Sequence, residues 1–407
     1  MRTSIPLTFV LSFTGSLLLS CGQAAPGPEL PETGLPQLSL PGVARLLSEL
    51  PLTRSQMEEV HDAVTASAAN GYDDEYMMCD LFESPGSGVG SARSTRAEAY
   101  ALPLRDLIRT RLSERLATRS GEADTQAIEA FIASLSASGM QIYWPYPEAW
   151  DGKTLPVITF DPESDAISNI GYGLKEGKDG TLTVESLPIV DEAMARERPV
   201  WVVNANDDSG YLTLEQLRRS DPEWGKGGRV IVGSAPPSAN ALHTRSGQDS
   251  DFRTLVLKEF KMKQHYDSWF RGASEFWVKC GSVQGFTAST EAELRLFSPT
   301  VTDFMISIKR NLLGISMPFD AVLISDWTDQ LDSFAFMIVE DDGGSQTSWK
   351  VEATVKVQSK SYGVTINIPY NERDDIVWRG SLSSRYFENY SGKVIHFGGV
   401  DVIFEIL

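Results

Sequence analysis

The segment FAFMIVEDDGG, residues 334–344, joins an apolar run to an acidic turn. Apolar side chains follow one another without interruption up to Val339, so a strand here has two apolar faces, which is typical of a strand in the middle of a core. Three carboxylates come next, Glu340, Asp341 and Asp342, and two glycines end the segment. The segment therefore predicts a central strand that runs directly into an acidic turn.

The region around this segment, residues 272–407, contains further short apolar or alternating runs. They are EFWVKCGSVQGF, TEAELRLF, DFMISIKR, FDAVLISDW, SWKVEATVKVQ, GVTINIPY and VDVIFEIL. Turn-forming residues separate them at spacings typical of a sandwich, so we expect an antiparallel β-sandwich or jelly roll. In the last run Val400, Val402, Phe404 and Ile406 alternate with polar or outward residues. This run predicts a strand that closes the sheet.

The preceding chain divides into a helical region, residues 46–139, and a small β-rich middle domain, residues 140–233. Apolar residues at helical spacing predict three helices, over residues 51–71, 103–116 and 124–139. From residue 140 the chain changes to short apolar runs with one helical candidate, VDEAMARE. Residues 234–271 read as a linker and an aromatic interdomain joint. The expected fold class is α+β, mainly β.

The first residues predict secretion. Residues 1–20 carry one charge, Arg2, and an apolar run too short and too interrupted for a membrane span, so we expect a signal peptide. Its end, Leu18 to Cys21, resembles the lipobox of bacterial lipoproteins. That resemblance implies cleavage before Cys21, lipidation of this cysteine and, because Gly22 follows it, transport to the outer membrane or cell surface. A cleaved signal with a chance cysteine is the alternative.

A proline-rich segment, residues 21–45, predicts an extended tether between the lipid and the folded part. We expect no later membrane span, because no later stretch is long and apolar enough. The formal charge of the chain is −19, and it becomes −20 once the single cation of residues 1–20 is removed. Such a surface repels nucleic acid, and it leaves carboxylates available for hard cations such as calcium.

Two acidic loops flank the strand at residues 334–339 and are candidates for a calcium site. One supplies Glu340, Asp341 and Asp342, and the loop before the strand supplies Asp326, Asp329 and Asp332. Calcium takes six to eight oxygen ligands, so the loops form a site if the sheet brings them to one end. This arrangement resembles calcium-binding β-sandwich domains, without their fixed spacing. The alternative is a solvated hairpin turn, since Asp-Gly favours such turns.

An aromatic cluster, YWPYPEAW, is the candidate for ligand binding. It places Trp144, Tyr146 and Trp150 near acidic side chains, and aromatic faces of this kind stack on sugar rings. A glycan or a protein is therefore a possible ligand. The alternative is that these rings belong to the core, where most aromatic side chains lie.

Two cysteines remain beyond Cys21, namely Cys79 and Cys280. In an oxidising compartment they can form one disulfide between the N-terminal and C-terminal regions. Spacing alone does not show that they are close, so two buried thiols are the alternative.

Motifs for catalysis are mostly absent. The four histidines are scattered, and the sequence has neither H-E-x-x-H nor a G-x-S-x-G elbow. The sequence therefore favours a binding or structural module, with a secreted hydrolase acting on glycan or peptide as the alternative. A hydrolase requires a paired nucleophile and base, or two facing carboxylates, in a deep pocket.

Four segments together resemble a family of secreted lipoproteins from Gram-negative bacteria. These segments are HYDSWFRGASEFWVKCGSV, VTDFMISIKR, EDDGG with its following SWK, and RDDIVWRG. The resemblance extends from about residue 142 to the end of the chain and includes the lipobox. It implies a location and a style of fold, and it implies no catalytic residues.

Overall fold

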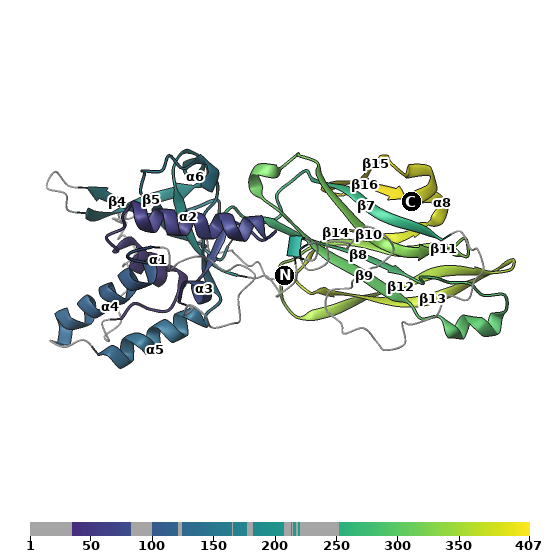
Figure 1. Cartoon of the computed structure of the whole chain (residues 1–407), viewed down its shortest axis with the longest axis horizontal. Helices are drawn as coiled ribbons and strands as arrows, with labels where there is room; N and C mark the ends of the chain where they lie inside the picture. Colours follow the sequence, from purple (N-terminus) through teal and green to yellow (C-terminus); the bar gives the residue numbers. More distant parts are fainter. Residues whose placement is uncertain are drawn as a thin grey trace, which may run out of the picture.

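The computed structural model describes residues 35–82, 100–120, 124–164, 166–176, 182–206, 213, 215–216, 219 and 252–407. The expected signal peptide, Cys21 and the first part of the expected tether lie outside these residues. Two units lie along the long axis of the molecule, one of helices around a sheet and one almost entirely of strands (Figure 1). The expected α+β, mainly β class is confirmed.

The helices of the first unit begin and end near the residues that the sequence predicts. The side chain of Thr53 accepts a hydrogen bond from Ser55 N, and the side chain of Gln56 accepts one from Thr53 N, so a reciprocal cap starts the second helix. The first helix begins inside the expected tether, behind Ser39. The helices are α1 (Leu40–Ser48), α2 (Arg54–Ala69), α3 (Met78–Phe82), α4 (Leu104–Ser120), α5 (Thr125–Ser136) and α6 (Glu192–Glu197).

A six-stranded sheet runs through the same unit, in the order β1-β2-β6-β3-β4-β5. Its strands are β1 (Glu75–Met77), β2 (Met140–Tyr143), β3 (Val157–Phe160), β4 (Ser168–Glu176), β5 (Leu182–Asp191) and β6 (Val200–Ala205). β1 comes from the expected helical region and pairs with β2. The apolar stripes of the helices are buried against this sheet in one cluster that includes Leu46, Val60 and Trp201. The helical region and the middle region therefore share one core instead of forming two domains.

The second unit is an antiparallel β-sandwich, as the sequence predicts. One sheet has the order β10-β7-β16-β15, and the other has the order β13-β12-β11-β8-β9, with β14 also beside β11. Rings from both sheets meet in the core, for example Phe260 with Phe276 and Phe336 with Phe404. The strands are β7 (Arg253–Met262), β8 (Ser274–Ser282), β9 (Thr300–Ile308), β10 (Met317–Trp327), β11 (Leu331–Glu340), β12 (Gln346–Val357), β13 (Lys360–Asn371), β14 (Asp375–Ser383), β15 (Val394–Phe397) and β16 (Val400–Ile406).

Strand β11 is buried on both faces, as its sequence predicts. Phe334, Phe336 and Ile338 lie in the core between the two sheets. Their neighbours Ala335, Met337 and Val339 lie in a separate cluster with residues of β12 and β13. The β12–β13 hairpin therefore covers the outer face of β11 as an additional layer.

Two expectations about the second unit are wrong. The run TEAELRLF is a 3₁₀ helix, η3 (Glu291–Leu296), instead of a strand. None of the residues of η3 is fully buried, although Leu294 packs against the edge of the sandwich core. The expected linker contains β7, which pairs with β10 and β16, both distant in the sequence. Long-range pairing decides the position of β7.

The two units are joined by the aromatic segment between β7 and β8. Trp269 and Phe270 pack against the second face of the first unit's sheet, beside Tyr143. Asp73 Oδ2 accepts a hydrogen bond from Ala273 N at 2.9 Å. Asn204 Nδ2 donates to the carbonyl of Phe270 at 3.0 Å. Both apolar burial and directed hydrogen bonds therefore hold the joint.

Candidate cation-binding site

The structure does not bring the six acids of the two expected loops together. Asp326, Asp329 and Asp332 lie in or near the connection from β10 to β11, whereas Glu340 is the last residue of β11. The two loops are therefore at opposite ends of one strand. Asp329 and Asp332 instead form ion pairs with basic residues of neighbouring strands. A single site that contains all six residues does not form, because the polarity of β11 separates them.

Asp341 stabilises a turn. Its side chain accepts hydrogen bonds from Trp277 Nε1 at 3.2 Å, Asn371 Nδ2 at 3.1 Å and Gly343 N at 3.1 Å. Gly343 and Gly344 have φ values of 67° and 101°, a region that favours glycine. Asp341 and the two glycines therefore form a turn, which was the alternative to a calcium site at these residues.

A different set of acids converges at the same end of β11. Asp267 lies in the aromatic joint, Glu275 is the second residue of β8, and Glu340 ends β11. One carboxylate oxygen from each lies within 4.8 Å of the others. Their side chains are buried, with exposed fractions of 8% for Asp267, 9% for Glu275 and 1% for Glu340. We refer to these three residues as the acidic cluster.

Glu340 is the most deeply buried member of the acidic cluster. Its Oε1 atom has no hydrogen-bond donor among the described residues. Burial and the neighbouring carboxylate of Asp267 strongly raise the pKa of Glu340. Burial also raises the pKa of Asp267. Without a cation, the pair therefore holds a proton between its two carboxyl groups.

Two arginines lie near the acidic cluster. Arg310 Nη1 donates to the backbone carbonyl of Asp267 at 3.0 Å. Arg271 lies 3.5 Å from Asp161 and 4.0 Å from Asp342. Even beside Arg271, the pKa of Asp342 is raised to about 6, first by burial and then by other carboxylates. Negative charge therefore predominates at this end of β11.

The geometry and the donor atoms suit a hard cation. Two oxygens bound to one calcium ion at about 2.4 Å lie at most about 4.8 Å apart, which the acidic cluster satisfies. All three side chains offer oxygen, and carboxylate oxygen favours calcium, magnesium or manganese over softer metals. The acidic cluster can thus hold a metal ion.

Sequence reasoning found Glu340 and missed Asp267 and Glu275. These two acids sit inside the aromatic run HYDSWFRGASEFW, which we interpreted as packing between units. The sequence does contain a signal for them: each acid lies among aromatic residues that are expected to be buried. A buried carboxylate requires a hydrogen-bond partner or a cation, so the two acids could have been identified as candidates.

The three aromatic candidates have different environments. Trp144 is fully buried and packs against His61, Trp150 and Trp201, so it belongs to the core of the first unit. Trp150 is half-buried beside it. Tyr146 alone among the three lines a cavity between the two units.

The expected disulfide between Cys79 and Cys280 is not formed in the structure. Cys280 is fully buried in the core of the sandwich, and burial raises the pKa of its thiol well above the ordinary value.

Comparisons of the chain with protein-family models, with curated proteins and with solved structures found no match. Function is therefore inferred from the residues and their geometry.

Proposed function

We propose that this protein is a binding or structural module, lipid-anchored at the outer membrane or cell surface, whose fold is stabilised by a calcium ion in the acidic cluster. The observation that carries the cation proposal concerns Glu340: its buried Oε1 atom has no donor among the described residues, and its side chain lies beside two further carboxylates. A buried carboxylate of this kind is costly unless it is protonated or bound to a cation.

Calcium fits the acidic cluster better than magnesium does. Magnesium usually keeps several water molecules, whereas calcium accepts a site supplied mainly by protein oxygens. The exposed fractions of Glu275 and Glu340, 9% and 1%, leave little room for such a water shell. A bound calcium would connect the joint, β8 and β11, because each contributes one carboxylate.

The lipid anchor is proposed from the sequence around Cys21. The LLSC sequence and the proline-rich segment after it support attachment by acyl chains and a spacer. No helix in the described part of the chain is long and apolar enough to cross a membrane. Replacing Cys21 with serine tests the anchor. We expect Cys21→Ser to move the protein from the membrane fraction to the soluble fraction, and unchanged membrane association would contradict lipidation.

Thermal unfolding of the full chain tests the cation. The parent, Glu340→Gln and the control Asp329→Asn are compared in calcium and in chelator. Asp329 lies at the other end of β11 and is 89% exposed in its side chain. We expect calcium to raise the melting temperature of the parent and of the control, since a ligand of the folded state stabilises it. Glu340→Gln should not respond.

The glutamine variant also separates a lost site from a failed fold. Its neutral amide can donate to Asp267, in place of the shared proton, so its stability in chelator should equal or exceed that of the parent. The proposal would be ruled out if calcium did not change the melting temperature of the parent, or if it raised that of Glu340→Gln as much as that of the parent.

The hydrolase alternative receives less support. Glu148 is the carboxylate on the wall of the cavity between the units, and it accepts a hydrogen bond from Asn311 Nδ2 at 2.7 Å. Asp267 and Glu340 are buried and do not line this cavity. Two facing carboxylates on one open pocket, which glycoside hydrolysis commonly uses, are thus not formed there.

A further inference from the structure

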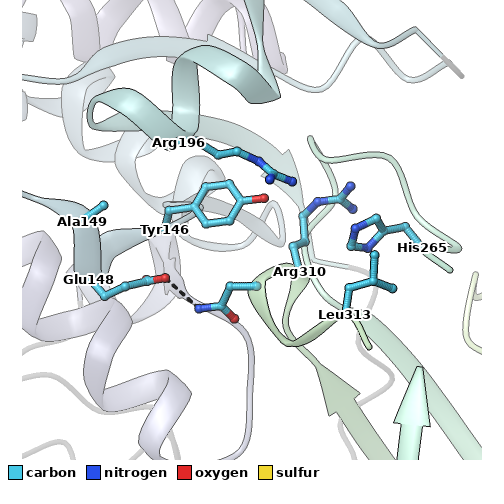
Figure 2. A pocket seen from close by; sticks show the side chains of 8 residues that line it. Tyr146, Glu148, Ala149, Arg196, His265, Arg310 and Leu313 are labelled. Carbon is cyan, nitrogen blue, oxygen red and sulfur yellow. Dashed lines mark hydrogen bonds between the residues drawn. The ribbon is translucent and has the colours of Figure 1, made fainter. Parts of the chain in front are cut away.

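A cavity of about 460 Å³ lies between the two units (Figure 2). Tyr146, Glu148 and Arg196 come from the first unit, and the other wall comes from the sandwich unit. This volume is within the range of small-molecule sites, which often form where two structural units meet. The second wall includes His265, Arg310 and Asn311.

One side of the cavity carries two guanidinium groups. Arg310 is 8% exposed and donates through Nε to Glu192 Oε1 at 3.0 Å. Arg196 Nη2 donates to the same oxygen at 3.1 Å. Two arginines and one glutamate leave one positive charge. Each guanidinium has five N–H donors, more than its bonds to described residues use, so both can donate to a ligand.

The side chains of Arg196 and Arg310 are held in position without a ligand. Tyr146 has φ 58° and ψ 48°, a left-handed conformation that is uncommon for tyrosine. Its hydroxyl donates to Glu192 at 2.6 Å, and Arg196 lies 5.3 Å from its ring centroid. Four contacts of Glu192 therefore fix the positions of Tyr146, Arg196 and Arg310. A prearranged site of this kind loses less entropy on binding.

The rest of the wall offers groups of the opposite kind. Glu148 carries an acceptor carboxylate, which accepts a hydrogen bond from the amide of Asn311 at 2.7 Å. A dashed line at Glu148 marks this bond in Figure 2. The Nδ1 atom of His265 is buried and has no partner among the described residues.

We infer that this cavity binds a small carboxylate that also carries a hydroxyl or amine donor. Its carboxylate would pair with Arg196 and Arg310, which match carboxylate geometry. Its donor would reach the carboxylate of Glu148. Both acidic sugars and amino acids or peptide ends have this chemistry, and one experiment distinguishes them.

Titration calorimetry of the full chain in calcium tests the inference with three probes. D-Glucuronate and L-threonine both carry a carboxylate and donors, while D-glucose is the neutral match of the first. We expect at least one carboxylate probe to bind about tenfold or more tightly than glucose, because charge-assisted hydrogen bonds discriminate at this level. Binding of glucuronate alone indicates an acidic sugar, and binding of threonine alone indicates an amino acid or peptide end.

Arg196→Gln is the decisive variant, because its side chain is 58% exposed and its loss should not prevent folding. It should weaken carboxylate binding about tenfold or more. Arg54→Gln makes the same change on the exposed face of α2 and should bind like the parent. The inference is overturned if neither carboxylate binds the parent at millimolar concentration, or if Arg196→Gln binds as the parent does.

Discussion

Glu340, the last residue of β11, lies directly opposite Asp375, the first residue of β14. Like charges at directly opposite positions of an antiparallel pair destabilise it. The same end of β11 holds Asp267 and Glu275, so four carboxylates gather where the joint, β8, β11 and β14 meet. This arrangement is stable only if protons or a cation offset the repulsion.

Removing the charge of Asp375 should stabilise the protein when no cation is present. We expect Asp375→Asn to raise the unfolding free energy in chelator by about 0.5 kcal/mol, the usual size of a cross-strand pair effect. In calcium the gain should shrink or reverse, since the cation already offsets the repulsion. Urea unfolding in the two buffers measures both values, and a loss of stability in chelator would argue against repulsion.

The stability without calcium should depend on pH in a definite direction. Burial raises the pKa of Asp342 and of Asp374 to about 6, above the ordinary value of 3.8. The folded state therefore binds more protons than the unfolded state does, and this contribution is complete below about pH 4 and disappears as the pH rises through 6.

We accordingly expect the melting temperature in chelator to fall between pH 4.5 and about 7. Asp342→Asn removes one of the titrating groups, so its melting temperature should fall less steeply over the same interval. Scans at several pH values, with parent and variant in matched buffers, measure the two slopes. Equal slopes would show that Asp342 does not contribute.

Gly272 should be intolerant of any side chain. Its φ is +129°, and a Cβ atom added there would lie 2.2 Å from Asp73 Oδ2, which accepts the hydrogen bond from Ala273 N. Gly272→Ala should cost about 2 to 4 kcal/mol from backbone strain and the disrupted joint. Gly314 has φ +77° and open space around it, so Gly314→Ala should cost about 1 kcal/mol. Denaturant unfolding compares them, and equal costs would refute a specific role for the joint.

The buried Lys279 pairs with the half-buried Asp303 at opposite positions of β8 and β9. Lys279 Nζ lies 3.4 Å from Asp303 Oδ2 and 4.4 Å from the ring of Trp277. Lys279→Met alone should destabilise by about 3 kcal/mol, because it leaves a half-buried carboxyl group without its partner. The double variant Lys279→Met, Asp303→Leu should recover most of that loss. A double variant as unstable as the single one would mean that packing around Trp277 dominates.

Local sequence patterns predict most helices and strands of this fold. They do not predict which strands pair when the strands are far apart in the sequence. The capped helix behind Thr53 and the doubly apolar β11 follow from residue order alone. The position of β14 beside β11, and of the β12–β13 hairpin over its outer face, depends on contacts between distant segments. Alternating runs specify that a strand has a buried face, and they do not specify which strand lies beside it.

The candidate site shows the same division. The three carboxylates after Val339 can be recognised as a candidate site because they are adjacent in sequence. In the structure one of them, Asp341, stabilises a turn instead. Asp267 and Glu275 join Glu340 only through the folding of the joint against β8 and β11. The cavity also escaped prediction, apart from Tyr146, because its two walls belong to different units.

The place of β16 between β7 and β15 has a consequence for the order of events during synthesis. β7 leaves the ribosome early in the second unit, while its partner β16 follows only after every other strand of the sandwich. Until then β7 has an unpaired edge in a chain rich in apolar strands, which invites aggregation. We expect the sandwich to fold slowly and after synthesis of β16, and a chaperone that shields exposed edges should raise its yield.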